Sequence, residues 1–201
     1  MTRWVIGVDE VGRGPLAGPV TVCAFAVRAD REVEVRAALE DAGCGDSKQL
    51  SSSVRERVAR AARRAVARGA ARASVRSVSA AAIDRDGINA AIARALSLAL
   101  SSLGIEAESC DVRLDGGLRA PRRFTCQRTI VRGDGSDLWI GAASCVAKVY
   151  RDGAMSRLAA RYPGYGFEEH AGYGTLGHRR AMRRLGLSPI HRRSFCRGFL
   201  A

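Results

Sequence analysis

Cysteine occurs in this 201-residue sequence, but not at the spacings that bind metals. The six cysteines form no Cys-x-x-Cys pair, and no histidine stands at zinc-ligand spacing from them. They do not indicate a disulfide framework either, so we expect small buried side chains. Proline amounts to five residues and aromatic residues to 5%. With ordinary apolar and charged fractions, this composition excludes fibrous and low-complexity proteins.

Long apolar runs are also missing. The longest, such as residues 20–27, are much shorter than the ~20 residues that a helix needs to cross a bilayer. The first residues lead straight into a strand-like run, so no signal peptide fits. We therefore expect a single domain over residues 1–201, with no membrane partner and a cytoplasmic location.

Acidic residues are scarce relative to basic ones. There are 20 Asp and Glu against 33 Lys and Arg, a formal net charge of +13. Lysine is limited to Lys48 and Lys148, and a GC-rich coding bias explains that choice of arginine but not the excess of positive charge. No acidic residue follows Glu169, while the C-terminus carries Arg179, Arg180, Arg183, Arg184, Arg192, Arg193 and Arg197. This excess favours a polyanionic partner such as a nucleic acid.

Apolar periodicity predicts a mixed α/β fold without internal repeats. We expect strands at residues 4–8, 20–27, 73–78, 110–114 and 127–131. Ser53 and Glu56 match a capping box and predict a helix that begins there and runs to about Gly69. Further helices are expected at residues 88–103, 138–160 and 176–185.

Acidic side chains follow several predicted strands. Asp9 and Glu10 come after the first run, and Asp115 and Asp134 follow later ones. An isolated Asp-Glu pair is more often a solvated turn, but four carboxylates from three segments could meet at one site. Such a cluster would need divalent cations to offset the repulsion, and all-oxygen ligation favours Mg²⁺ or Mn²⁺.

Glycines follow the first strand with the spacing Gly12-x-Gly14-x-x-Ala17, which formally matches a dinucleotide-binding fingerprint. That fingerprint must open a helix, whereas Pro15 and the residues after it lead into a second β-type run. We therefore reject a dinucleotide site. The pattern instead predicts a loop that another chain can approach closely, with Arg13 exposed between the glycines.

Several motifs in this order resemble one known family. The first is Gly-Val-Asp-Glu-Val-Gly-Arg-Gly-Pro-Leu-Ala-Gly-Pro-Val at residues 7–20, and the others lie at residues 46–50, 114–116, 133–134, 142–152, 162–163, 170–175 and 188–195. They resemble type 2 ribonuclease H (ribonuclease HII). The resemblance implies an RNase H-like fold, with a mixed central sheet flanked by helices and a helical C-terminal portion at roughly residues 162–201.

The same resemblance implies cleavage of the RNA strand of RNA/DNA hybrids, and of duplex DNA on the 5′ side of a single embedded ribonucleotide. The reaction is two-metal-ion hydrolysis with Mn²⁺ or Mg²⁺, giving 5′-phosphate and 3′-hydroxyl ends. The protein is expected to be a monomer, and a contact with a sliding clamp stays open.

Individual residues match the family's site. The metal-binding carboxylates would be Asp9, Glu10, Asp115 and Asp134. Gly12, Arg13 and Gly14 match the loop whose backbone senses the ribose 2′-hydroxyl, and Tyr173 matches the aromatic residue beside the sugar at the RNA-to-DNA junction. The resemblance also favours Lys48 and Lys148 as phosphate contacts. Ala171 departs from the pattern, because relatives commonly have lysine there.

Some alternatives stay open. Asp137 could replace Asp134 as the fourth ligand, whereas Asp152 fits an ion pair on its helix better than a metal ligand. The three histidines show no ligand spacing and are expected to be structural or peripheral phosphate contacts. A non-catalytic nucleic-acid-binding protein and another nuclease of the same fold, such as a junction resolvase or exonuclease, are the rival functions.

Overall fold

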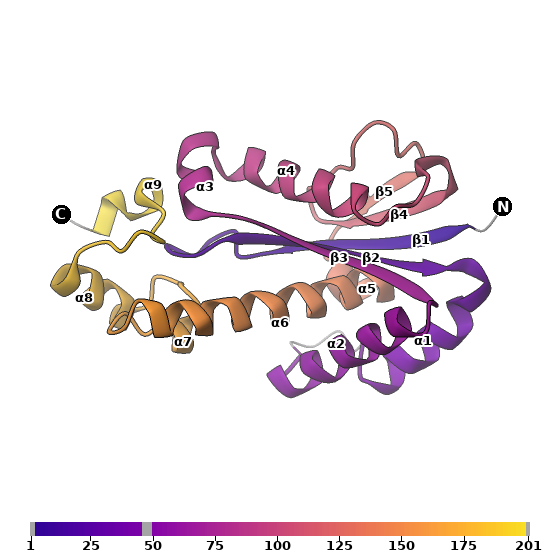
Figure 1. The fold of residues 1–201 in the computed structure, drawn as a ribbon, viewed down its shortest axis with the longest axis horizontal. Coiled ribbons are helices and arrows are strands. Elements are labelled where there is room, and N and C mark those ends of the chain that lie inside the picture. The colour runs from indigo at the N-terminus through magenta and orange to yellow at the C-terminus, as the bar shows by residue number, and fades with distance from the viewer. Residues whose placement is uncertain (1–2, 46–49, 200–201) are drawn as a thin grey trace.

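A five-stranded mixed sheet forms the centre of the protein (Figure 1). The structure is a computed structural model that describes residues 3–45 and 50–199. The strand order is β3-β2-β1-β4-β5, and β1 runs antiparallel to β2 and parallel to β4. The strands are β1 Trp4–Val11, β2 Val20–Arg28, β3 Ala71–Val78, β4 Cys110–Asp115 and β5 Gln127–Ile130.

Helices cover both faces of this sheet, with α3 and α4 on one side and α1, α2 and α6 on the other (Figure 1). Neighbouring residues of β1 point to opposite faces, so Ile6 and Val8 pack toward α4 while Val5 packs with Trp139 of α6. The helices are α1 Glu32–Asp41, α2 Ser52–Ala67, α3 Ala80–Asp86, α4 Ile88–Ser101, α5 Gly133–Ser136, α6 Leu138–Arg161, α7 Phe167–His170, α8 Leu176–Leu185 and α9 Arg193–Cys196.

Helix α6 lies unusually close to β1. A Cβ atom at Gly7 would stand 2.1 Å from the backbone of Trp139, so only glycine allows the helix and strand to meet here. This approach brings the first half of α6 beside the end of β1.

The C-terminal portion is helical, as expected, and packs at the end of the sheet where β1 turns into β2 (Figure 1). The isolated bridge between Ala17 and His191 joins the two segments. Helix α8 begins after Thr175, whose hydroxyl accepts from the His178 amide, so this predicted helix has the expected bounds.

Several predicted boundaries are wrong. The ladder with β2 continues to the pair Val11 and Thr21, so Asp9 and Glu10 lie inside β1 rather than after it. Helix α2 is capped by Ser51, not Ser53, because the Ser51 hydroxyl accepts from the Val54 amide. No helix was expected over the residues that form α1.

Two expectations from composition can be compared with the described residues. Five of the cysteines are buried as expected, whereas Cys126 is exposed because it lies just before the edge strand β5. No helix in residues 3–45 and 50–199 is long and apolar enough to cross a membrane.

Candidate metal and nucleic-acid site

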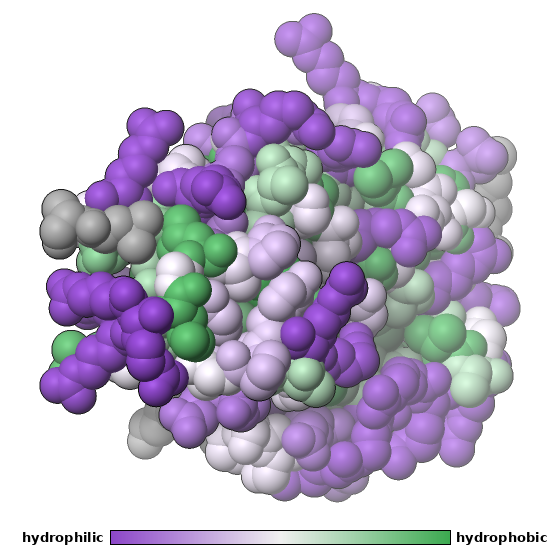
Figure 2. All heavy atoms as spheres, turned by 60° about the vertical axis from the view of Figure 1, so that its left-hand side comes forward, coloured by the Kyte–Doolittle hydropathy of each residue, from purple (hydrophilic) through white to green (hydrophobic). Residues whose placement is uncertain are grey.

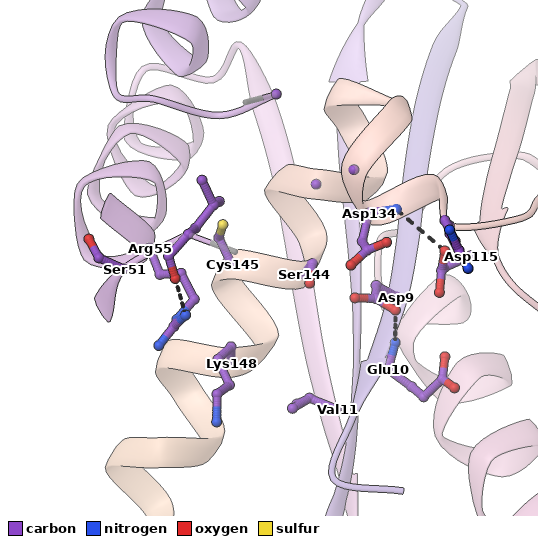
Figure 3. Close-up of a pocket in the computed structure, with 15 residues that line it drawn as sticks. Asp9, Glu10, Val11, Ser51, Arg55, Asp115, Asp134, Ser144, Cys145 and Lys148 are labelled. Carbon is purple, nitrogen blue, oxygen red and sulfur yellow. Dashed lines mark hydrogen bonds between the residues drawn. The ribbon is translucent and has the colours of Figure 1, made fainter. Parts of the chain in front are cut away.

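A pocket of about 840 Å³ opens between the end of β1, the end of β4, and helices α2, α5 and α6 (Figure 3). It is larger than a neighbouring pocket that reaches Tyr173 and than a third pocket between α7 and α8. All the carboxylates expected to bind metal line it, namely Asp9, Glu10, Asp115 and Asp134. The structure thus brings together residues from three separate segments.

Asp9 is the most buried of these carboxylates, with 6% of its surface exposed. It faces α6, because β1 residues alternate and Gly7 also faces that helix. Burial raises the pKa of Asp9 to about 8, and the nearby charges of Glu10 and Asp115 act in the same direction. A hydrogen bond with the Ser144 side chain opposes this rise.

Glu10 points toward the other face of the sheet. Its Oε1 atom accepts a hydrogen bond from Nη1 of Arg13 at 3.2 Å, and Nη2 of Arg13 donates to Asn89 of α4 at 3.0 Å. The Oε2 atom is buried and has no hydrogen-bond partner among the described residues. Burial raises the pKa of Glu10. This oxygen is therefore desolvated without compensation, which is costly unless a ligand occupies the pocket.

Asp115 holds the segment that carries Asp134. Its Oδ1 atom accepts from the Gly133 amide at 2.7 Å and from the Asp134 amide at 3.3 Å. Asp134 therefore lies in the short helix α5, not directly after β5, and its carboxylate points toward Asp9 (Figure 3).

Asp137 has a different role. Its Oδ1 atom accepts from the amides of Trp139 and Ile140 at the start of α6, and its Oδ2 atom pairs with Arg113 at 2.9 Å. Both oxygens are engaged in the fold, which favours Asp134 over Asp137 as the fourth carboxylate.

The donor set of the pocket fits a hard divalent cation. It offers carboxylate oxygens, one of them buried without a partner, and no sulfur or imidazole ligand is needed. Among the described residues, however, no three His, Cys, Asp or Glu side chains are close enough to hold an ion as they stand. In this arrangement Glu10 is paired with Arg13.

Lys148 extends the pocket along α6. Its Nζ atom donates to Asp152 at 2.8 Å, which confirms Asp152 as an ion-pair partner on the helix. Lys148 also lines a second pocket of about 490 Å³ that reaches Tyr173.

The predicted phosphate contact Lys48 lies outside the described residues. Arg55 of α2 lines both pockets and was not predicted, because nothing in its arginine-rich helix distinguishes it.

Tyr173 stands beside the glycine loop. The position of a Cβ atom at Gly14 would be 4.0 Å from Cε1 of the Tyr173 ring, with no other non-neighbouring atom within that distance. The residue is 44% exposed. Gly12 has φ +88°, and a Cβ there would stand 2.2 Å from Nε of Arg151, so both backbone and space require glycine.

His178 and His191 are buried and form hydrogen bonds within the protein, which agrees with a structural role. His178 donates from Nδ1 to the Tyr173 carbonyl oxygen at 2.8 Å, and its Nε2 atom lies 3.1 Å from Nε2 of His191. His191 accepts from the Ser188 amide through Nδ1. This chain of hydrogen bonds supports the backbone of Tyr173 from inside the protein.

Several residues of the site were missed by sequence analysis. Ser144, Asn89, Arg151 and Arg192 carry no distinctive spacing, although all but Asn89 fall within the family-like motifs. Only packing shows what they contact. Arginines of α8 and of the C-terminal segment are exposed. Figure 2 turns this end of the protein forward and shows hydrophilic side chains around a paler, partly hydrophobic centre.

Comparisons with known proteins agree with this architecture. A family model described as Ribonuclease HII matches residues 6–198. A ribonuclease HII from Rhodospirillum rubrum is 46% identical over 191 residues, covering 95% of this chain and 83% of that protein.

Solved structures give the same result for the fold. Ribonuclease H2 from Pyrococcus horikoshii OT3 has a TM-score of 0.74 at 25% identity and covers 98% of this chain and 97% of its own. The structure of a PCNA:RNase HII complex from Archaeoglobus fulgidus gives 0.72 at 24% identity, covering 95% and 93%.

The mixed sheet, its flanking helices and these likenesses define the class as an α/β nuclease with an RNase H-like fold. More narrowly, the chain belongs to the ribonuclease HII family. It is a ribonuclease H, a hydrolase that acts on the RNA strand of RNA/DNA hybrids.

Proposed function

We propose that this ribonuclease H also cuts duplex DNA on the 5′ side of a single embedded ribonucleotide, leaving 5′-phosphate and 3′-hydroxyl ends. The observation that supports this best is the loop of Gly12, Arg13 and Gly14 standing beside the Tyr173 ring. A single ribonucleotide differs from its neighbours only by a 2′-hydroxyl, so backbone groups in a rigid loop are suited to detect it.

The carboxylate pocket is the proposed place of hydrolysis. Asp9, Glu10, Asp115 and Asp134 would hold two divalent cations, Mn²⁺ or Mg²⁺, between them. Bound there, the cations would supply an activated water and would stabilise the leaving 3′-oxygen. A solved Bst-RNase HIII of this fold is described in complex with Mn²⁺. Asp115 orients the Asp134 segment through backbone amides, which holds two of the carboxylates in place before the substrate arrives.

We expect the substrate to lie along two neighbouring pockets that share lining residues. Lys148 and Arg55 line both, so they would contact phosphates between the carboxylates and the junction-binding Tyr173. Lys48 remains a predicted phosphate contact. The net charge of +13 would strengthen binding without reading sequence.

A cleavage assay on three nucleic-acid substrates tests the proposal. One carries a single ribonucleotide, one is an RNA/DNA hybrid, and one is an all-DNA junction. With Mg²⁺ or Mn²⁺ the first two should be cut and the third left intact, and chelator should stop the reaction. Cleavage of the all-DNA junction would favour the rival nuclease function, and metal-independent binding without cleavage would favour the rival binding protein.

Metal binding needs a readout that does not depend on activity. We expect Mn²⁺ at about 100 times its dissociation constant to stabilise the protein by about 2.7 kcal/mol, seen as a rise in Tm. Asp9→Asn should lose most of this rise. An equal rise in both proteins would place the ion elsewhere.

The remaining expectations concern partners and location. The Archaeoglobus fulgidus relative is described in complex with PCNA, which supports a sliding clamp as a partner of this chain too. A monomer and a cytoplasmic location stay predictions. Copurification with the clamp would test the clamp contact. The mass of the protein in solution would test whether it is a monomer.

A further inference from the structure

Two arginines are completely buried beneath the loop that joins β1 to β2. Arg151 of α6 and Arg192 before α9 both have 0% exposed surface. Neither forms a salt bridge with a carboxylate among the described residues, since every polar contact of their guanidinium groups is to a backbone carbonyl. Burying a charge in this way is costly, so carbonyl oxygens must replace the lost water.

The carbonyls that they engage enclose one loop. Arg192 donates to the carbonyl oxygens of Gly12 at 2.6 Å, Arg13 at 2.9 Å and Gly18 at 3.0 Å. Arg151 donates to the carbonyl oxygens of Pro19 at 3.0 Å, Ala17 at 3.4 Å and Ala171 at 3.0 Å. Since Ala171 lies two residues before Tyr173, the same pair of arginines fixes both the loop and the turn that carries the ring.

Because the peptide group is rigid, fixing the loop carbonyls also fixes the direction of the loop amides. In a trans peptide the C=O and N–H bonds point in opposite directions. The Gly12 carbonyl shares its peptide with the Arg13 amide, and the Arg13 carbonyl shares its peptide with the Gly14 amide. Pulling both carbonyls inward therefore turns both amides outward. No described protein group accepts a backbone hydrogen bond from either amide.

We propose that Arg192 is a positioning residue for 2′-hydroxyl recognition, because it turns the Arg13 and Gly14 amides toward the substrate. Arg151 supports the far end of the loop and ties it to the Tyr173 turn. This inference rests on the proposed function, in which the loop senses the ribose. The inference adds the buried Arg192 guanidinium as the group that holds the Arg13 and Gly14 amides in place.

Arg192→Lys is the variant that separates positioning from charge. Lysine keeps the positive charge but cannot reach three carbonyls with a planar fork. The readout is the ratio Ki/KM. Ki is measured for an all-DNA duplex as competitor, and KM for the same duplex with one ribonucleotide. Neither constant depends on the fraction of active enzyme. We expect this ratio to fall about tenfold in Arg192→Lys, through a higher KM at constant Ki.

Arg72→Lys is the matched control. Arg72 also donates to two carbonyl oxygens, those of Leu103 and Gly104, but it lies on β3 away from the loop. Its substitution should leave the ratio unchanged. A loss of stability in Arg192→Lys alone would lower the fraction of active enzyme, but it would leave this ratio unchanged.

The outcomes are distinct. If the wild type does not cut the single-ribonucleotide duplex, the proposed function fails. If it cuts but the ratio is already near one, or stays the same in Arg192→Lys, only the present inference is overturned. Should Arg192→Lys fail to fold, Arg151→Lys takes its place: it should lower the ratio by a smaller factor, and an unchanged ratio would overturn the inference.

Discussion

The carboxylate pocket and the loop of residues 12–19 both bury charge, but they compensate for it in different ways. In the pocket, Asp9 has its pKa raised to about 8, and Glu10 keeps a buried oxygen without a partner. At the loop, Arg151 and Arg192 satisfy their buried guanidinium groups with backbone carbonyls. The pocket is thus complete only with a ligand, whereas the loop is already organised. Substitutions should therefore affect the cleavage step in the first region, and stability together with recognition of the ribonucleotide in the second.

The largest expected effect is on cleavage by Asp9→Asn. The change removes a carboxylate from the pocket, so kcat should fall on the order of 10³-fold or more while substrate binding survives. The free energy of unfolding should stay the same or rise, because the amide has no charge to bury. Single-turnover cleavage, hybrid binding and urea unfolding measure the three effects.

Asp111→Asn is the control for that experiment. Asp111 on β4 is a buried aspartate like Asp9, but it pairs with Arg113 and Arg128. We expect cleavage to remain and unfolding free energy to fall by about 1 kcal/mol. Wild-type cleavage in Asp9→Asn would refute its place in the site.

The next effect is on stability, through Arg192→Met. Methionine fills similar space but leaves three buried carbonyl oxygens without donors, so the free energy of unfolding should fall by about 3 kcal/mol. Arg72→Met should cost less than about 1 kcal/mol, because Arg72 is exposed and water can replace it. Equal losses in urea unfolding would contradict the comparison.

A pH-dependent effect on stability, no larger than the last, is expected from the histidines below Tyr173. Burial and the neighbouring His178 lower the pKa of His191 to about 4, from 6.5 for an exposed histidine. Between these values the unfolded chain binds a proton that the folded chain does not. The free energy of unfolding should therefore fall as pH drops from 6.5 to 4, by up to about 3 kcal/mol.

The variant His191→Asn isolates this contribution, because asparagine does not titrate. It should be less stable than the wild type at pH 7, and the difference should shrink as pH falls toward 4. Parallel stability curves for the two proteins would mean that the pKa of His191 is the same in the folded and the unfolded chain.

The smallest effect is expected from Ala171→Lys. Ala171 lines the pocket between Lys148 and Tyr173, so a lysine there would add a phosphate contact. The slope of log Kd against log salt should increase by about 1 unit for the RNA/DNA hybrid. Ala171 has φ +47°, a conformation that costs lysine no more than alanine, so Tm should hardly change. An unchanged slope would show that no phosphate passes this point.

Some features of the site were predictable because they depend on local sequence. Asp115 ends β4 and α8 runs over the predicted residues, so both lie at the expected places. Asp9 and Glu10 were expected together at a strand end. The ladder with β2 instead carries them inside β1, where alternation sends their side chains to opposite faces.

Sequence by itself determined the family, the order of most helices and strands, and the acidic residues that line the pocket, because motifs and apolar periodicity are local properties. Tertiary structure alone decided which of the many arginines are buried and what they hold. Arg192 contacts Gly12 across 180 positions of the chain. Such a contact depends on how distant segments pack, and an arginine destined for the core looks the same in the sequence as one that stays in water.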